Sequence, residues 1–365
     1  MKKLLLAIVV FLGACGEDRP AAPSAPPPPP PSPADVFEAL PTDVQLNREK
    51  VVLGRALFHD TRLSGDNTIS CSSCHSLDMG GAEHDRTSTG IRGQVGPINS
   101  PTVLNAVYNF RQFWDGRAAD LLEQAAGPVT NPIEMGGDWP TILERLRADQ
   151  ALAAQFTAVY GQSGVTQANV LDAIVEYERS LVTPSRFDRY LRGEQSALDA
   201  QEQRGMSRFI EAGCTTCHRG RNIGGDSYQK MGLLRSYFEL RGGELTEADN
   251  GRFNVTHQES DRHFFKVPTL RNVEHTAPYF HDGSHATLPE AVRTMGRVQL
   301  NRELSDADVA DIVAFLRSLS GEIPADARMP AAPAAPPAEG TAPAAPAEGT
   351  TAPAAPAQGA APAAP

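Results

Sequence analysis

Two Cys-x-x-Cys-His motifs, at residues 71–75 and 214–218, constrain the fold of this chain more than any other feature. Each has the pattern of a c-type haem attachment site, in which both cysteines form thioethers to the porphyrin and the histidine binds the iron. One Cys-x-x-Cys alone could be half of a zinc site or a redox pair, but two copies each followed by His favour haem. The predicted haem-binding residues are Cys71, Cys74, His75, Cys214, Cys217 and His218.

The start of the chain has the pattern of an export signal. Two lysines precede the apolar run 4–12, which is too short to span a bilayer as a mature helix. The run ends in Leu-Gly-Ala-Cys, which resembles a bacterial lipobox, so we expect residues 1–15 to be a lipoprotein signal. Cleavage before Cys15 would leave a lipidated cysteine; a plain secretory signal is the alternative.

The cysteine count agrees with export. Five cysteines are two haem pairs plus Cys15, which leaves none for a disulfide. Haem c is attached outside the bacterial cytoplasm, so we expect the protein in the periplasm. The residue after Cys15 is Gly16 and not the aspartate associated with inner-membrane retention, which favours anchoring in the outer membrane. A net charge of −11 argues against nucleic acid as a partner.

Low-complexity segments flank the central part of the chain. Residues 20–34 consist of Pro, Ala and Ser, so we expect a Pro-rich linker at 16–40 that extends by about 3.1 Å per residue. Residues 326–365 are rich in Ala and Pro and lack the large apolar side chains that bury a core. We expect this tail to be disordered.

The central part contains an internal duplication. Residues 101–116 (PTVLNAVYNFRQFWDG) align without a gap with residues 268–283 (PTLRNVEHTAPYFHDG). In both copies the order is Cys-x-x-Cys-His, Gly-Gly, this string and then Met-Gly. The pattern predicts a mainly α protein with two cytochrome c-like domains, at 41–184 and 185–325, each carrying one covalent haem.

Capping signals support the helical interpretation. Thr166 precedes an apolar stripe of helical period, and Ser305 with Asp308 begins another such stripe that we expect Gly321 to end. Few stretches alternate as strands do.

Long strings give the chain a family resemblance over roughly residues 42–322. NSPTVLNAVYNFRQFWDGRAADLLEQAAGPV, IEMGG, VPTLRNV and APYFHDG resemble the bacterial dihaem cytochrome c peroxidases, a family that also contains the MauG-type enzymes. The resemblance implies an N-terminal haem that cleaves hydrogen peroxide and a C-terminal, high-potential haem. The second haem would take electrons from a small soluble donor, a cytochrome c or a cupredoxin. Family members are often dimers, which implies a homodimer here.

Matched positions carry the family's roles to single residues. His75 and His218 match the proximal ligands, and Met295 matches the distal ligand of the electron-transfer haem, where a thioether raises the potential. Glu134 matches the acid–base residue that relays a proton during O–O cleavage. Alternatively, Met295 is a core methionine and Glu134 a solvated surface acid.

Three further roles follow from the same resemblance. Gln124 matches a pocket residue that orients peroxide, and Trp114 matches a tryptophan between the haems, which relays electrons or only packs. The remaining matched residues form a calcium site between the domains: Asn99, Thr276 and Pro278. An amide oxygen and backbone carbonyls are ligands that calcium accepts.

The chain departs from the family at one position. Many members carry a histidine in a Ser-Ile-Gly-His string that caps the first iron in the oxidised enzyme, but here the string is Ser-Thr-Gly-Ile and ends at Ile91. We therefore expect an open distal site in the diferric protein. The alternative is that His84 moves in as a substitute ligand.

Two other functions compete with a peroxidase. One is a MauG-like oxidase of a protein substrate, although that enzyme carries tyrosine where this chain has Met295. The other is a non-catalytic dihaem electron carrier, which would not need Glu134. The sequence does not identify the electron donor.

Overall fold

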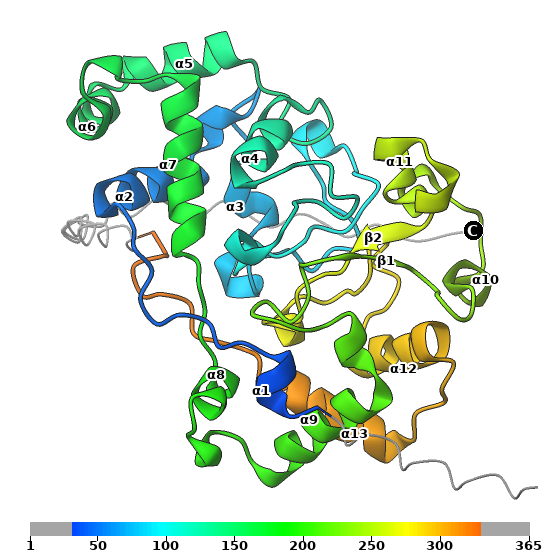
Figure 1. Cartoon of the computed structure of the whole chain (residues 1–365). Helices are drawn as coiled ribbons and strands as arrows, with labels where there is room; N and C mark the ends of the chain where they lie inside the picture. The colour runs from blue at the N-terminus through cyan, green and yellow to red at the C-terminus, as the bar shows by residue number, and fades with distance from the viewer. Residues whose placement is uncertain (1–30, 330–365) are drawn as a thin grey trace, which may run out of the picture. The chain divides into compact units, whose positions relative to one another are not determined.

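The computed structural model describes residues 31–329, which form a mainly helical protein, as predicted (Figure 1). The signal with Cys15, the first part of the linker and nearly all of the tail lie outside the described residues. The α-helices and strands are α1 (Pro33–Val36), α2 (Arg48–Phe58), α3 (Cys71–Cys74), α4 (Leu121–Thr130), α5 (Trp139–Ala148), α6 (Gln150–Tyr160), α7 (Gln167–Ser180), α8 (Arg186–Leu191), α9 (Ala200–Ala212), β1 (Tyr228–Lys230), α10 (Tyr237–Arg241), α11 (Phe253–Thr256), β2 (Phe264–Lys266), α12 (Leu288–Leu300) and α13 (Asp306–Arg317).

Two crossed helix pairs confirm the internal duplication. Helix α2 packs on α7 in the first repeat, and α9 packs on α13 in the second (Figure 1). A Cβ on Gly54 of α2 would lie 1.8 Å from the Ala173 carbonyl oxygen, and a Cβ on Gly205 of α9 would lie 1.8 Å from that of Asp311. Both crossings are therefore close enough that only glycine fits.

The loops that follow the haem motifs repeat as well. Asn105 and Asn272 both adopt left-handed backbone, with φ of 60° and 59°, and each precedes a 3-10 turn. Phe113 and Phe280, further along the same strings, have φ of 68° and 72°. The aligned strings thus fold to the same local backbone.

Each repeat has its own apolar core. The first core is built from residues between Val51 and Leu181, and the second from residues between Phe187 and Leu319. Helix α7 begins after Thr166, whose side chain accepts a hydrogen bond from Asn169 N–H, as predicted. Helix α13 begins after Ser305 as predicted but ends at Arg317, before the expected stop at Gly321.

The segments next to both ends cross over to the opposite core. Phe37 is buried in the second core, edge-on to Phe187 at 5.2 Å, and Leu40 N–H donates to Asp188 Oδ1 at 2.7 Å. Residues 33–40, within the stretch expected to be linker, are therefore folded. Conversely, Ala327 is buried in the first core, and its carbonyl accepts a hydrogen bond from Tyr177 Oη at 2.7 Å.

A buried ion pair holds the N-terminal segment to the second repeat. Arg271 and Asp188 are both fully buried, and they form two hydrogen bonds, at 2.9 Å and 3.0 Å. Arg271 Nε also donates to the Arg221 carbonyl. Because every charge here has partners, the pair avoids the cost of an isolated buried ion.

One small sheet forms in the second repeat. Strands β1 and β2 pair antiparallel, with Tyr228 opposite Lys266. Between residues 31 and 329, no helix is both long and apolar enough to cross a membrane.

Helix α7 carries a buried acid where the second repeat has an apolar residue. Tyr177 and Phe315 occupy equivalent places at the two helix crossings, so Glu178 corresponds to Leu316. Burial raises the pKa of Glu178 to about 8, and its Oε2 has no hydrogen-bond partner among the described residues. An acid with a raised folded pKa contributes stability below its unfolded pKa, and this contribution is lost as pH rises through the folded pKa.

We predict that Glu178→Leu raises the free energy of unfolding, and that the gain is larger near about pH 8 than near about pH 5. The difference should reach a few kcal/mol at most, since one pKa unit corresponds to about 1.4 kcal/mol. Denaturant unfolding of the haem-loaded protein at both pH values measures it, with the exposed Glu144→Leu in α5 as control. If the free energy of unfolding of Glu178→Leu has the same pH dependence as that of the wild-type protein, Glu178 is ionised in the native protein.

Candidate haem sites and the contact between them

The first haem motif forms a short helix that ends at its histidine. Helix α3 places Cys71 and Cys74 one turn apart, on the same face. Burial raises the pKa of both thiols to about 12, so they would be neutral and poor metal ligands if free. The four cysteines within residues 31–329 form no disulfide. Half-buried cysteines without a disulfide, on one face of the helix, fit thioether attachment of a haem.

The backbone orients His75 for metal binding. Its Nδ1 lies 3.3 Å from the Gly81 carbonyl oxygen and 3.4 Å from Ser100 Oγ. Burial lowers the pKa of His75, so the ring is neutral, and Nδ1–H donates to the carbonyl while Nε2 remains free for iron. Gly80 and Gly81, with φ of 73° and 72°, make the turn that brings this carbonyl under the ring.

The second motif repeats this arrangement. Cys214 begins a 3-10 turn after Gly213, and His218 Nδ1 lies 3.3 Å from the Ile223 carbonyl oxygen. Burial lowers the pKa of His218 to about 4, which leaves a neutral imidazole. A Cβ on Gly224 would lie 2.2 Å from the Pro268 carbonyl oxygen, so the loop passes close under the histidine. Both motifs therefore fit a haem with one protein histidine.

Glu134 lies in the loop after α4, held from two sides. Its Oε1 accepts a hydrogen bond from Asn131 Nδ2 at 2.9 Å, and its carbonyl accepts one from Ile91 N–H at 2.7 Å. Burial raises the pKa of Glu134, while Arg117 and the Asn131 hydrogen bond oppose the shift. A partly buried carboxyl with a raised pKa is suited to accept and return a proton.

Gln124 comes from α4 itself. This helix begins after Asp120, whose side chain accepts a hydrogen bond from Glu123 N–H, and Gln124 lies on it half-buried. Its side-chain amide has no hydrogen-bond partner among residues 31–329, so it is free to contact a ligand.

The two candidates for the missing distal ligand have different positions. Ile91 is buried, and its side chain packs beside Gly65 and Gly136. His84 is exposed, and its Nε2 lies 3.1 Å from the His275 carbonyl oxygen in the second repeat. His84 therefore takes part in the contact between the repeats.

Met295 lies in the middle of α12, half-buried. The preceding Thr294 is fixed by a 2.8 Å hydrogen bond between its Oγ1 and His285 Nε2. Met135, the equivalent residue of the first repeat, is buried in the first apolar core and follows Glu134. The two equivalent methionines thus differ in environment, since Met135 is part of an apolar core and Met295 is half-buried on a helix.

Trp114 lies at the contact between the repeats. Its Nε1 donates to the Asn99 carbonyl at 2.9 Å, and its ring is edge-on to His281 and Phe265, with centroids 6.3 Å and 6.5 Å away. His281 is the residue equivalent to Trp114 in the second repeat. The two equivalent aromatic side chains therefore meet each other across the contact.

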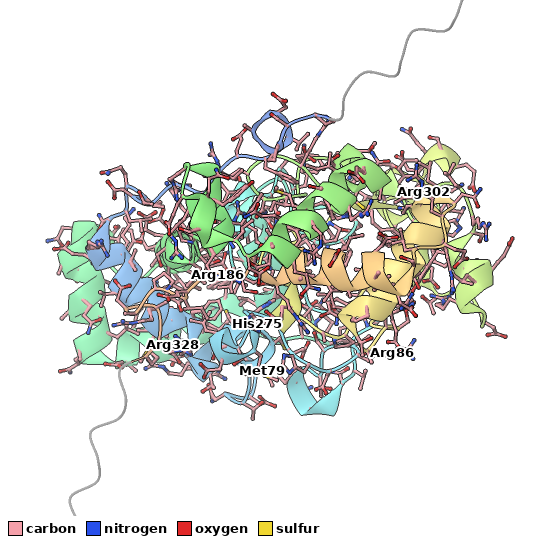
Figure 2. All side chains as sticks on the ribbon, turned by 90° about the horizontal axis from the view of Figure 1, so that it is seen from below. Met79, Arg86, Arg186, His275, Arg302 and Arg328 are labelled. Carbon is pink, nitrogen blue, oxygen red and sulfur yellow. The ribbon has the colours of Figure 1, made fainter. Side chains whose placement is uncertain are left out.

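The residues of the expected calcium site flank the same contact. Asn99 is buried, and its N–H donates to the His281 carbonyl at 2.8 Å. Within residues 31–329, no hydrogen bond reaches Asn99 Oδ1 or the carbonyls of Thr276 and Pro278. Figure 2 labels Arg86 and His275 from the two sides of this contact, and Arg86 Nε donates to the Asp282 carbonyl at 2.9 Å.

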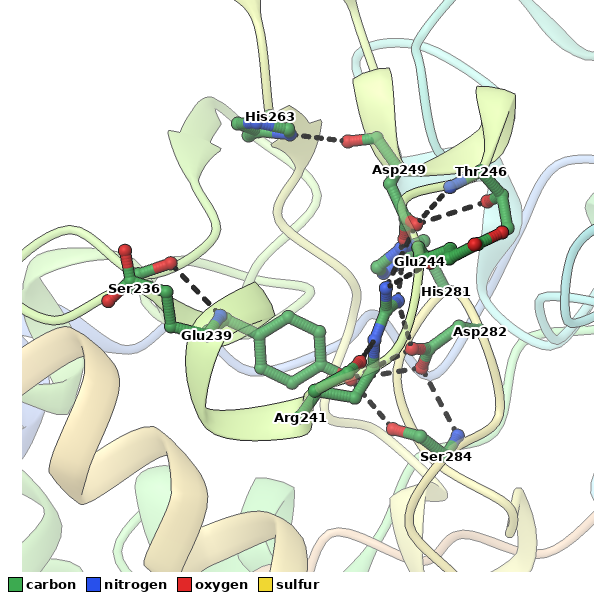
Figure 3. A network of polar contacts seen from close by, with 12 residues as sticks. Ser236, Glu239, Arg241, Glu244, Thr246, Asp249, His263, His281, Asp282 and Ser284 are labelled. Carbon is green, nitrogen blue, oxygen red and sulfur yellow. Dashed lines mark hydrogen bonds and ion pairs between the residues drawn. The ribbon is translucent and has the colours of Figure 1, made fainter.

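A buried network of charges behind His281 was not predicted from the sequence. Arg241 Nη1 donates to Asp249 at 2.7 Å and to Asp282 at 2.8 Å, and His281 Nε2 lies 2.8 Å from Asp249 (Figure 3). Although burial alone would raise it, hydrogen bonds from His281 and Arg241 hold the pKa of Asp249 well below its usual range. Asp249, His281 and Asp282 have the composition of a metal site, but Arg241 already supplies the cation. No sequence motif marks Arg241 or Asp249.

The comparisons with known proteins agree with this geometry. The family model of di-haem cytochrome c peroxidase matches residues 48–196, and that of cytochrome c matches residues 202–320. The cytochrome c peroxidase Ccp of Escherichia coli is 51% identical over 286 residues, which cover 78% of this chain and 60% of that protein. The cytochrome c551 peroxidase of Nitrosomonas europaea is 48% identical over 288 residues, which cover 79% of this chain and 84% of that protein.

A solved structure shows the same architecture. The crystal structure of a MauG-like protein associated with microbial copper homeostasis superposes with a TM-score of 0.68 at 29% identity, covering 82% of this chain and 96% of that one. Both repeats are thus cytochrome c-type units with one haem c each, and the resemblance inferred from the sequence is confirmed. The chain belongs to the di-haem cytochrome c peroxidase family.

Proposed function

We propose that this protein reduces hydrogen peroxide to two waters, consuming two protons and two electrons. The electrons come from a small periplasmic cytochrome c or cupredoxin. The observation that carries the proposal is Glu134, a partly buried carboxyl with a raised pKa in the first repeat only. The equivalent position before Met295 is Thr294, so the two repeats have unequal chemistry.

Glu134 performs the proton transfer in this proposal. Haem iron at His75 supplies the redox chemistry that cleaves the O–O bond. The Glu134 carboxylate accepts the proton of the inner peroxide oxygen and returns it to the outer oxygen, which leaves as water. Asn131 holds the carboxyl in place, and the unpartnered amide of Gln124 orients the peroxide. Because the carboxylate form is needed, turnover should fall as pH drops below the raised pKa of Glu134.

The second repeat delivers electrons. We assign Met295, with His218, as the residues that would hold the iron of the second haem, where a thioether ligand would raise the potential and leave no site for peroxide. Trp114 and His281 are equivalent residues whose rings lie edge-on across the contact, with centroids 6.3 Å apart, and we assign them as the electron relay.

We assign a calcium ion to Asn99, Thr276 and Pro278. Support comes from Asn99 Oδ1 and the carbonyl oxygens of Thr276 and Pro278, which accept no hydrogen bonds from the described residues, and from the buried position of Asn99. The ion would join the two repeats next to Trp114, whose side chain lies at the contact between them.

Export and anchoring belong to the same proposal. Attachment of haem c places the protein in the periplasm, and the lipobox at Cys15 anchors it to the outer membrane, with the Pro-rich segment as spacer. A homodimer is proposed only because members of the family are often dimers.

A MauG-like oxidase and a pure electron carrier are the alternatives. Met295 in place of tyrosine argues against the first, and Glu134 against the second. Turnover of peroxide with a reduced cytochrome c or cupredoxin distinguishes them, since neither alternative sustains it.

Glu134→Gln should leave both haems attached and lower peroxide turnover by roughly 10²–10⁴, which is the usual worth of a positioned acid–base group. Steady-state oxidation of reduced cytochrome c measures the loss, and Glu144→Gln on the exposed face of α5 is the control. A decrease of only a few fold would remove Glu134 from the mechanism.

Met295→His should keep both haems and lower the potential of the second, because imidazole donates more strongly to ferric iron than a thioether does. Spectroelectrochemical titration measures both potentials. If neither changes, Met295 does not bind the iron.

The oxidised protein should show one high-spin ferric haem by electron paramagnetic resonance and react with peroxide before any electron is supplied. The reason is that Ile91 cannot bind iron and His84 is engaged by the His275 carbonyl. Two low-spin haems, one of which becomes high-spin in His84→Ala, would contradict this and identify His84 as the substitute ligand.

A further inference from the structure

Lys266, the last residue of β2, is a buried cation without a partner. Only 5% of its surface is exposed, and its Nζ forms no hydrogen bond or ion pair with the described residues. Burial lowers its pKa to about 8, with no nearby acid opposing the shift. Removing most of a lysine side chain from water without a counter-ion is unfavourable, so this position favours an anionic partner that residues 31–329 do not supply.

The internal duplication explains where Lys266 lies. It precedes Pro268 by two residues, as Asn99 precedes Pro101. Asn99 N–H donates to the His281 carbonyl at 2.8 Å, and Lys266 N–H donates to the Trp114 carbonyl at 2.8 Å. Since Trp114 and His281 are equivalent residues, the two hydrogen bonds are related by the symmetry of the repeats. Lys266 is thus the counterpart of Asn99 on the other side of the contact.

Both positions adjoin the haem-binding loops. The backbone of Pro101 acts to raise the pKa of His75, and the backbone of Pro268 acts to raise that of His218, although burial outweighs both effects. In each repeat the proline lies beside a proximal histidine, and the residue two positions before it, Asn99 or Lys266, lies at the contact between the repeats. At this contact the first repeat presents a neutral amide, whereas the second presents an ammonium.

Residues 31–329 offer no carboxylate within ion-pair distance of this ammonium. The acid next to Trp114 is Asp115, and it is paired with Arg117 at 3.0 Å. On the strand opposite, Tyr228 faces Lys266, and its hydroxyl contacts Arg252 and the Gly116 carbonyl. Carboxylates do arrive with the cofactors, because each haem c carries two propionates.

We propose that Lys266 is the fixed counter-cation of a haem propionate at the contact between the two repeats. On the other side of the contact, the equivalent residue Asn99 is neutral, and the positive charge there would come from the proposed calcium ion. The proposal rests on haem attachment and is independent of the peroxidase activity. A positive charge beside a propionate disfavours the ferric state of that haem, so Lys266 raises its potential.

Three variants of the haem-loaded full chain test this. Lys266→Met removes the charge but keeps an unbranched apolar side chain, Lys266→Arg keeps the charge, and Lys230→Met removes an exposed lysine from the paired strand β1. Spectroelectrochemical titration gives both potentials, and the pyridine haemochrome assay gives the haem content. We expect Lys266→Met to lower the potential of at least one haem with two haems retained. Lys266→Arg should restore it, and Lys230→Met should leave both potentials unchanged.

Unchanged potentials in a Lys266→Met protein with two haems would overturn the proposal. If that variant does not accumulate, a crystal structure of the wild-type haem-loaded protein decides. Lys266 Nζ within hydrogen-bond distance of a propionate oxygen supports the proposal, and Nζ paired with any other group overturns it.

Discussion

A reciprocal pair of backbone hydrogen bonds joins the two haem-binding repeats, and the arrangement of the site depends on it. Asn99 N–H binds the His281 carbonyl, and Lys266 N–H binds the Trp114 carbonyl, both at 2.8 Å. Because the four residues are two equivalent pairs, the contact is a pseudo-twofold one. It brings the two aromatic side chains together and sets a neutral amide on one side and a cation on the other.

Within this symmetric scaffold the chemistry is not symmetric. The two helix crossings are equally close: a Cβ built on Gly54 or on Gly205 would lie 1.8 Å from a carbonyl oxygen of the facing helix. The two repeats therefore present their histidines in the same way. One difference between the repeats is Glu134 in the first, where the second has Thr294. In the proposed function, one fold therefore supplies both a site that cleaves peroxide and a site that only transfers electrons.

The sequence was sufficient for features that depend on residues close together in the chain. The haem motifs, the duplication and the helix start at Thr166 all follow from short-range patterns, and all are found. The exchange of the segments around Phe37 and Ala327 between the cores was not predicted, because it depends on contacts across nearly the whole chain. The Arg241–Asp249 pair was missed for another reason, since no motif marks either residue, and the burial of Lys266 is visible only in the folded protein.

The exchanged segments also govern how the protein is made. Phe37 leaves the ribosome long before the residues of the second core against which it packs, and Ala327 closes a core whose other residues end at Leu181. The second core lacks its last residue until Leu319 has been made, and the first core until Ala327 has been made, so neither is complete in a shorter nascent chain. The order of assembly therefore favours attachment of both cofactors before the final closure. It also means that cutting the chain between α7 and α8 would yield two fragments that each lack a piece of their own core.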